Sequence, residues 1–372
     1  MFVSVSIPFF IALRLSLSNG FMENSNFQDH IVAGVHLTIR GNFFEKGQYQ
    51  QLINMSLIGH PKRIKVLPPC IFKPIPLWSG KQLISTLLLN LIPDGKPLVS
   101  LVSKSKVSPK NWSTHPAREW KAGGDKFNDP DMDMSESRVI FRRGQLLCGV
   151  LDKSQYGGSS YGLVHACYEL YGGKVSTALL TSLARLFTVY LQYHGFTLGI
   201  GDIICTSEGD SARKVAAAKA WTEGPKAMKA FFDKRSDDVG ASSSSSDLPS
   251  RIQRAIFSRD AVGDIVGEID HAMKSVTDNV NNDITRAIIP KGLIKKFPSN
   301  NLQLMIQTGA KGSSVNGLQI SALLGQIELE GRRPPLMLSC RTLPSFLPFD
   351  LTPRAGGFID GRFLTGIKPQ VS

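Results

Sequence analysis

The segment GAKGSSVNGLQ, residues 309–319, carries residue types and a spacing that suit the binding of an anion. Gly309 and Gly312 allow the backbone to approach a ligand closely, and Lys311 between them supplies a point charge suited to a phosphate group. The G-x-x-x-x-G-K-[ST] spacing of a Walker loop is missing, however. The segment therefore predicts either a phosphate-binding turn or an ordinary glycine turn before a capped helix.

A helix is expected directly after this turn. Ser313 or Ser314 can cap it, and its first N–H groups would then point toward the same anion. Asn316 and Gln319 are three residues apart, so they would share one face of that helix and could offer amide donors. The candidate contacts of a ligand are thus glycine backbone, one ammonium, a serine and two amides.

Trp78 belongs to a second segment of interest, KPIPLWSGKQ at residues 73–82. One interpretation is a basic surface loop with Trp78 as its anchor. The other, which residue types alone favour, is that Trp78 fills a core while Lys73 and Lys81 stay in solvent.

Acidic residues alternate in NDPDMDMSE, at Asp129, Asp131, Asp133 and Glu136. A calcium loop of the EF-hand type needs a glycine at its sixth position and a glutamate at its twelfth, and neither is present. We therefore favour a solvated acidic loop over a metal site.

Histidine and cysteine residues are scattered along the chain. The 7 histidines show no H-E-x-x-H or other ligand spacing, and the 5 cysteines form no C-x-x-C pair. We expect His165 to be a hydrogen-bonded packing residue rather than a catalytic base. No metal site, disulfide framework or catalytic residue is predicted, and a reducing compartment is the simpler assumption.

The elements that position these residues begin with a strand, indicated by the alternation in IVAGVHLTI at residues 31–39, and a short helix over 48–55. Residues 60–126 are rich in Pro, Lys and Arg, and the prolines exclude a long helix. Within them, the apolar residues 83–92 predict a buried core element that is too short to cross a membrane.

Two short strands fit residues 137–143 and 145–152. The dipeptide Arg143-Gly144 between them predicts a hairpin turn.

Two helices are expected in the middle of the chain. One runs from 174 to 194 and ends at Gly195, as helix C-termini often do. The other covers 207–235 and has Asp210 or Ser211 as its cap.

A further helix is expected over 251–289, ended by Pro290. The low-complexity sequence ASSSSSDLPS, residues 241–250, predicts a flexible loop tip before it. Two long helices joined by such a tip form a helical hairpin.

The composition limits the class of protein. With 372 residues, of which 42% are hydrophobic and 20% charged, the chain is long enough for two or three domains with cores of their own. A formal net charge of +13 favours a polyanionic partner, without separating nucleic acid from an acidic protein or a membrane surface. The apolar start, residues 2–13, has no preceding basic residue and no clean cleavage site, so secretion is not expected.

Five segments match one known pattern in order and in spacing. They are KPIPLWSGKQ (73–82), LLCGVLDKSQYGGSSYGLVH (146–165), GFTLGIGDI (195–203), QTGAKGSSVNGLQISALLGQIELEGRRPP (307–335) and GGFIDGRFLTGIKP (356–369). Together they strongly resemble the largest subunit of multisubunit DNA-dependent RNA polymerases. The forms QDHIVAGVHLTIRGNFF, GQLLCGVLDKSQYG and GQIELEGRRPPLM are most similar to the RNA polymerase I version, and the resemblance runs from about residue 27 to residue 369.

The resemblance implies a mixed α+β, irregular fold, in which a pore domain of short strands and loops precedes a funnel domain with a helical hairpin. It assigns residues 27–206 to the pore domain, 207–340 to the funnel domain and 341–372 to the start of the domain that leads into the bridge helix. Residues 1–26 match nothing in the family. We interpret them as a truncated or misassembled reading of the gene rather than a targeting peptide.

In this family, pore and funnel form a secondary channel that admits nucleoside triphosphates and receives the 3′ end of backtracked RNA. Lys311 occupies the position of a basic residue that faces this channel, and Asn316 that of a neighbouring amide. The implied substrate-channel residues are Lys311, Asn316, Gln319, Gly309, Gly312 and Ser313. Trp78 and Lys81 are carried over as a structural motif, with Trp78 packing between segments of the subunit.

The function implied by the resemblance is DNA-templated synthesis of the ribosomal RNA precursor in the nucleus and nucleolus. The implied partners are other RNA polymerase I subunits, template DNA, RNA, nucleoside triphosphates and a transcript-cleavage factor or subunit at the funnel, with no membrane. The N-A-D-F-D-G-D motif that holds Mg²⁺ in the complete enzyme is absent, so neither a cofactor nor a catalytic residue is assigned to this chain. We expect the chain alone to be inactive, and the alternative function is a truncated non-catalytic module that binds nucleic acid or protein.

Overall fold

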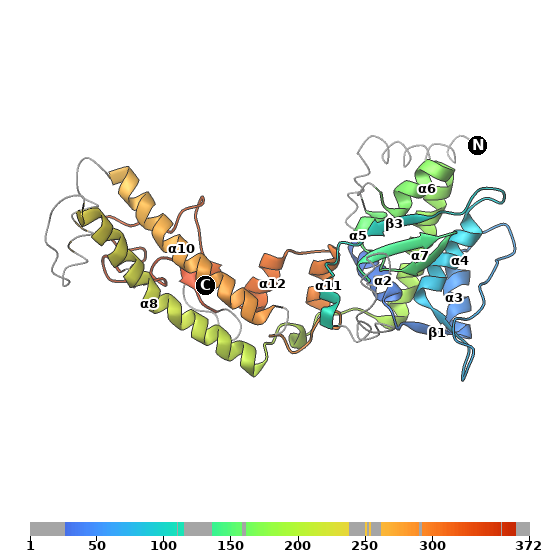
Figure 1. The fold of residues 1–372 in the computed structure, drawn as a ribbon, viewed down its shortest axis with the longest axis horizontal. Coiled ribbons are helices and arrows are strands. Elements are labelled where there is room, and N and C mark those ends of the chain that lie inside the picture. Colours follow the sequence, from blue (N-terminus) through green and yellow to red (C-terminus); the bar gives the residue numbers. More distant parts are fainter. Residues whose placement is uncertain are drawn as a thin grey trace, which may run out of the picture. The chain divides into compact units, whose positions relative to one another are not determined.

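The computed structural model describes residues 27–109, 111–114, 136–157, 161–237, 250, 253, 262–289, 292–350 and 352–361. These residues form two compact units (Figure 1). The first consists of the residues up to Gly199 together with Phe297–Ser313, and the second of Ile200–Lys296 together with the residues from Ser314 onward. The expected mixed α+β fold is confirmed, since the described residues form mostly helices and three small antiparallel sheets.

Several sequence predictions lie outside the described residues. They concern the start at residues 1–26, the acidic positions Asp129, Asp131 and Asp133, and most of the serine-rich segment 241–250.

The first unit packs helices around two small sheets. Its elements are α2 (Phe27–Thr38), β1 (Phe43–Glu45), α3 (Lys46–Ser56), β2 (Leu77–Ser79), α4 (Gly80–Leu91), β3 (Leu101–Lys104), η1 (Asn111–Thr114), β4 (Arg138–Arg142), β5 (Gln145–Cys148), α5 (Lys153–Tyr156), α6 (Leu163–Tyr171), α7 (Gly173–His194) and α11 (Asn301–Thr308). The helices α2, α3, α4 and α7 pack against one another, and their apolar faces form the core.

Helix α2 occupies the segment for which the sequence predicted a strand. The successive residues Ile31, Val32 and Ala33 are all buried, as are Val35 and Leu37. Burial of three successive side chains fits a helix that is surrounded by α4, α7 and α11, and not a strand with one wet face. The strand prediction was wrong because burial on most sides removes the polar positions that would have marked a helical face.

Helix α4 begins with the sequence SGKQ of the second candidate segment. Ser79 Oγ accepts a hydrogen bond from Gln82 N at 3.3 Å, and Gln82 Oε1 accepts one from Ser79 N at 3.0 Å, which together make a capping box. Gly80 has no room for a side chain, because a Cβ there would lie 1.8 Å from the carbonyl oxygen of Leu37. The buried element expected over 83–92 is confirmed as this helix.

Strands β3, β4 and β5 form an antiparallel sheet in that order. Arg143 and Gly144 join β4 to β5 with positive φ angles of 49° and 74°, as in type I′ turns, so the predicted hairpin is confirmed. Val139 and Phe141 are fully buried on the inner face of the sheet. Among the described helices, none packs closely on β3 or β4, so none covers the outer face of these two strands.

The helices expected near residues 48–55 and 174–194 are confirmed as α3 and α7. Helix α7 ends at Gly195, whose φ of 69° lies in the region that favours glycine. Its buried side chains, among them Leu183, Leu186 and Phe187, make it the central helix of the first unit.

The second unit is built on two long helices. Its elements are η5 (Ile200–Asp202), α8 (Ser207–Asp237), α10 (Val262–Ile288), α12 (Ser314–Ser321), β6 (Gly325–Gln326) and β7 (Phe358–Ile359). Helices α8 and α10 lie side by side and run in opposite directions, so the predicted helical hairpin is confirmed (Figure 1). The residues that they bury together are Ala216, Ala217, Ala220, Val280, Ile284 and Ile288.

Arg213 ties α8 to the last strand of the second unit. Its guanidinium is buried, lies 2.8 Å from Asp210 Oδ1 and donates a hydrogen bond to the carbonyl of Asp360 at 2.9 Å. The predicted cap of α8 was one turn too late. Thr206 Oγ1 accepts a hydrogen bond from Gly209 N at 3.2 Å and so caps the helix, which leaves Asp210 free to pair with the arginine.

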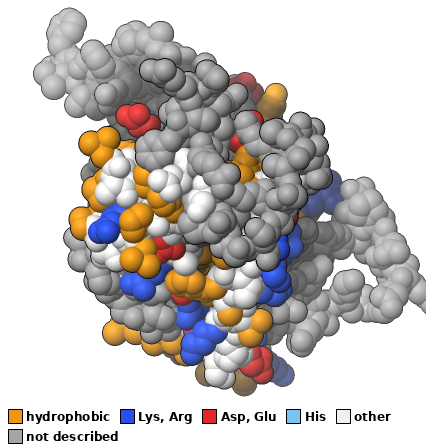
Figure 2. All heavy atoms as spheres, turned by 90° about the vertical axis from the view of Figure 1, so that its left-hand side faces the viewer, with side chains coloured by type: hydrophobic (Ala, Val, Ile, Leu, Met, Phe, Trp, Pro, Cys, Tyr) orange, Lys and Arg blue, Asp and Glu red, His pale blue; other side chains and the backbone are white. Residues whose placement is uncertain are grey.

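Large apolar side chains stand in solvent after β6. They are Leu329, Leu336, Met337, Leu338, Leu343 and Leu347. Figure 2 shows hydrophobic side chains interspersed with Lys and Arg on the face of the molecule that it draws. Within the described ranges, no helix combines the length and the apolarity that crossing a bilayer requires.

His36, Tyr190 and His194 meet at one edge of the first unit. His36 Nδ1 lies 3.0 Å from Tyr190 Oη, and the two imidazole rings meet edge to face with 4.2 Å between their centres. Burial, helped by the neighbouring His194, lowers the pKa of His36 to about 4, and burial raises the pKa of Tyr190 to about 12. Both His36 and Tyr190 are therefore neutral at pH 7.

Acidification should destabilise the first unit through His36. The pKa of its ring is about 4 in the folded chain against 6.5 for a free histidine, so the neutral ring stabilises the fold above pH 6.5. This contribution falls as the pH drops from 6.5 toward 4, by at most about 3 kcal/mol in the free energy of unfolding. Urea denaturation across this pH range should show a shallower pH dependence for His36→Gln than for wild type. The exposed His271→Gln serves as control, and equal slopes for His36→Gln and wild type would contradict the prediction.

Candidate functional site

The candidate anion-binding turn lies at the end of helix α11. Gly309 takes a left-handed conformation with a φ of 76°. The N–H groups of Gly309 and Ala310 return to the carbonyls of Ile306 and Met305, at 3.2 and 3.0 Å. This is the Schellman ending of a helix, in which a residue other than glycine would be strained.

Lys311 and Gly312 continue the turn. Gly312 also has a positive φ, of 82°. The side chain of Lys311 is exposed, and its ammonium has no ion-pair partner among the described residues. Ser313 directly precedes α12, at the position of a cap. The turn thus combines an unpaired positive charge with backbone that a ligand can approach closely.

A second lysine, which the sequence analysis did not single out, lies against the same turn. A Cβ added to Gly309 would be 2.5 Å from Lys106 Nζ, so the Lys106 side chain rests on this glycine. Lys106 is exposed and, within the described part of the chain, also has no ion-pair partner. The only signal for it in the sequence was the general excess of Lys and Arg over residues 60–126.

Two contacts hold the segment after Lys106 against α11 and the residues that precede this helix. Asn111 Nδ2 donates a hydrogen bond to Gln307 Oε1 at 2.6 Å. The ring of Trp112 meets the ring of Phe297 edge-on, with 4.9 Å between their centres. The place of Lys106 beside the turn is therefore set by packing within the first unit.

A buried carboxylate fixes the backbone of Lys106 itself. Asp152 is fully buried and accepts hydrogen bonds from the N–H groups of Lys106 and Ser154. Burial raises the pKa of Asp152, although these hydrogen bonds oppose the shift. Asp152 thereby joins the end of β3 to the start of α5.

The predicted amides belong to the other compact unit. Asn316, which is exposed, and Gln319, which is half-buried, both lie on α12. Gly309, Lys311 and Gly312 belong to the first unit. Joint use of the amides and the lysine therefore stays a prediction.

Trp78 is buried, and Lys81 is largely withdrawn from solvent. Trp78 stacks on Tyr49, with 5.1 Å between ring centres, and donates a hydrogen bond from Nε1 to the carbonyl of Leu67 at 2.9 Å. Lys81 Nζ lies 2.8 Å from Glu136 Oε1, and only 13% and 6% of these two side chains are exposed. The expectation that Lys81 and Glu136 stay in solvent was wrong, because their pairing lets both charges be buried.

His165 is not the packing residue that the sequence predicted. Its side chain is 44% exposed and lies 3.6 Å from Glu169 Oε1, one helical turn further along α6. In the described ranges, no three His, Cys, Asp or Glu side chains gather as a metal site. Those ranges therefore contain no residues that fit the Mg²⁺ implied by the resemblance.

Two sequence-family models match this chain. One, described as RNA polymerase Rpb1, domain 3, matches residues 15–203. The other, described as RNA polymerase Rpb1, domain 4, matches residues 258–359. The chain therefore belongs to the Rpb1 family of RNA polymerase largest subunits.

Its curated relatives include RNA polymerase I subunits of several organisms. The chain is 48% identical over 343 residues to subunit RPA1 of Drosophila melanogaster, 40% identical over 348 residues to subunit RPA190 of Saccharomyces cerevisiae, and 35% identical over 380 residues to subunit 1 of Arabidopsis thaliana. These alignments cover 92%, 92% and 95% of this chain and 20%, 19% and 22% of the relatives. The resemblance to the largest subunit of RNA polymerase I is confirmed, and the chain spans about a fifth of the length of these relatives.

The finer division of the chain stays a prediction. The first matched range begins at residue 15, so the expectation that residues 1–26 match nothing in the family was wrong for residues 15–26. The two matched ranges leave residues 204–257 between them and end at 359. They do not fix a pore domain at 27–206, a funnel domain at 207–340 or a following domain at 341–372.

Breaking the Lys81–Glu136 pair should destabilise the first unit. Lys81→Met or Glu136→Leu leaves one largely buried charge without its partner, and we expect a loss of about 3–5 kcal/mol in the free energy of unfolding. The double variant Lys81→Met/Glu136→Leu should recover part of the loss, because no charge then remains buried. Urea denaturation of the four proteins gives the coupling energy. Losses below about 1 kcal/mol for both single variants would mean that the pair behaves as a surface ion pair.

Proposed function

We propose that this chain supplies the pore and funnel parts of the largest subunit of RNA polymerase I, and that the turn from Gly309 to Gly312 faces the secondary channel. In the assembled enzyme it would serve DNA-templated synthesis of the ribosomal RNA precursor. Its partners would be the other subunits, template DNA, RNA, nucleoside triphosphates and a transcript-cleavage factor or subunit at the funnel. Its site of action would be the nucleus, and within it the nucleolus.

One observation carries the part of the proposal that concerns the turn. Lys311 presents an exposed ammonium with no described ion-pair partner between two glycines of positive φ, in a chain that matches two Rpb1 domains. A phosphate group needs a positive charge and room to approach it, and this turn provides the ammonium of Lys311 beside Gly312, which has no side chain. Nucleoside triphosphates and the 3′ end of backtracked RNA both carry phosphates.

The residues of the turn have a binding role in this proposal and no role in bond formation. Lys311 would attract a phosphate, and Lys106 beside Gly309 would add a second positive charge at the same turn. The described residues include no cluster that fits the Mg²⁺ of nucleotidyl transfer. Catalysis is therefore assigned to groups other than the described ones.

Lys311→Ala, placed in a complete RNA polymerase I largest subunit, should weaken the handling of phosphate-bearing ligands while leaving assembly intact. Loss of one charge-assisted contact removes about 1.5 kcal/mol of binding, which is roughly a tenfold change in KM for nucleotides or in the rate of transcript cleavage. Elongation and cleavage assays on the purified enzyme measure both. Lys226→Ala, an exposed lysine on α8, is the matched control. Unchanged kinetics of both reactions would refute the role of Lys311.

The chain on its own should not polymerise nucleotides. We expect no extension of a primed template by the purified chain in the presence of nucleoside triphosphates and Mg²⁺, because no described residues fit the metal. Extension above the level of a heat-denatured sample would contradict this.

A further inference from the structure

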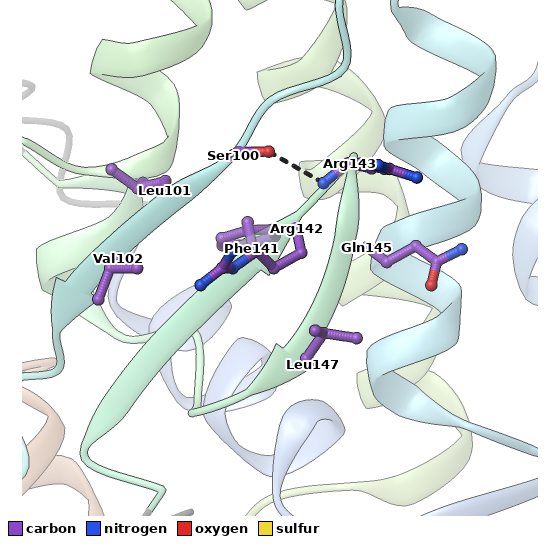
Figure 3. Close-up of a pocket in the computed structure, with 8 residues that line it drawn as sticks. All are labelled: Ser100, Leu101, Val102, Phe141, Arg142, Arg143, Gln145 and Leu147. Carbon is purple, nitrogen blue, oxygen red and sulfur yellow. Dashed lines mark hydrogen bonds between the residues drawn. The ribbon is translucent and has the colours of Figure 1, made fainter. Parts of the chain in front are cut away.

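The outer face of the sheet formed by β3, β4 and β5 has no part in the turn or in the core. Side chains alternate along each strand, and the outward ones are Val102, Lys104, Arg138, Ile140, Arg142, Gln145 and Leu147. We call this set the outer sheet face. A cavity of about 550 Å³ lies over part of it (Figure 3).

The centre of the outer sheet face is apolar. Val102 pairs with Ile140 across β3 and β4, and Leu147 lies at the irregularity where β5 meets Ile140. Val102 is 51% and Leu147 is 55% exposed. Exposing a row of aliphatic side chains to water is unfavourable. Covering it with a partner would stabilise the complex in proportion to the apolar area buried.

The margin of the face is positively charged. Lys104 and Arg142 project from the strands, and Arg143 stands at the hairpin turn, where its N–H donates to Ser100 Oγ at 3.0 Å (Figure 3). The described residues that line the cavity include no Asp or Glu. Glu136, at the start of β4, is buried and engaged with Lys81. None of the described lining residues therefore supplies a negative charge to match these arginines.

Two other kinds of partner fit the face less well. Sheets that bind single-stranded nucleic acid stack bases on exposed aromatic rings, whereas the one aromatic residue among the lining residues, Phe141, is fully buried on the inner side. A second copy of this chain, related by twofold symmetry, would bring Arg142 and Arg143 of both copies together, and like charges repel. Arginine around an aliphatic centre is instead typical of protein interfaces.

We propose that the outer sheet face binds an acidic segment of another protein. Aliphatic side chains of that segment cover Val102, Ile140 and Leu147, and its carboxylates pair with Arg142 and Arg143. This interaction does not involve the turn from Gly309 to Gly312. Its test is therefore independent of the proposed role of Lys311.

The test measures binding of the full chain to a fluorescein-labelled short peptide composed of Asp, Glu and Leu, by fluorescence anisotropy. We expect saturable binding that weakens with salt, and a loss of about tenfold or more in affinity for Leu147→Asp and for Arg142→Glu. Both changed side chains are exposed, and circular dichroism checks that the variants stay folded. The matched controls are Val66→Asp and Lys174→Glu, which make the same changes in charge at exposed positions away from the sheet.

Three results would overturn the proposal. Equal losses in the test and control variants would mean attraction by net charge alone. Stronger binding of a labelled oligouridylate of similar length, with the same dependence on Leu147 and Arg142, would make the face a nucleic-acid site. A dimer of the wild-type chain in analytical ultracentrifugation that Leu147→Asp abolishes would make it a contact between copies.

Discussion

A single buried carboxylate, that of Asp152, helps to fix the positions of the two surfaces of the first unit for which binding is proposed. It accepts hydrogen bonds from the N–H groups of Lys106 and Ser154, and Ser154 Oγ in turn donates to the carbonyl of Lys104. These bonds replace the water that the carboxylate lost on burial, and without them the buried charge would not be tolerated. Strand β3 ends at Lys104, two residues before Lys106, and strand β5 ends at Cys148, four residues before Asp152. The outer sheet face and the place of Lys106 beside the turn from Gly309 to Gly312 therefore depend on the same buried group.

Two recognisable motifs of this chain have different physical origins. In SGKQ, Gly80 touches the carbonyl of Leu37 and Lys81 pairs with Glu136 in the interior, so the motif is explained by packing. In GAKGSS, Lys311 is exposed. The positive φ angles at the end of α11 explain the glycines on either side of it, but they do not explain the lysine. A family signature alone does not separate these cases, whereas burial and pairing do.

The features that sequence reasoning predicted well are local. The turn at Arg143 and Gly144 and the end of α7 at Gly195 follow from backbone preferences of the residues concerned. Contacts between distant segments cannot be read from local residue preferences, as the pairing of Lys81 with Glu136 shows. The contact of Lys106 with Gly309 was likewise not foreseeable, because nothing in the sequence around Lys106 marks it as a neighbour of that glycine. Helix α2 was missed for another reason, since its burial on most sides erased the helical period of its polar residues.

The discontinuity of the first unit bears on how the chain is made. Phe297 and Leu304 belong to the core that α2 and α7 build, yet they follow the entire α8–α10 hairpin in the sequence. A ribosome that synthesises from the N-terminus therefore delivers the hairpin before it delivers the last pieces of the earlier core. During translation, part of the apolar surface of α2 and α7 therefore stays exposed to solvent until α11 has been synthesised. The unit whose synthesis starts first is thus the one that cannot close until residue 313 has been added.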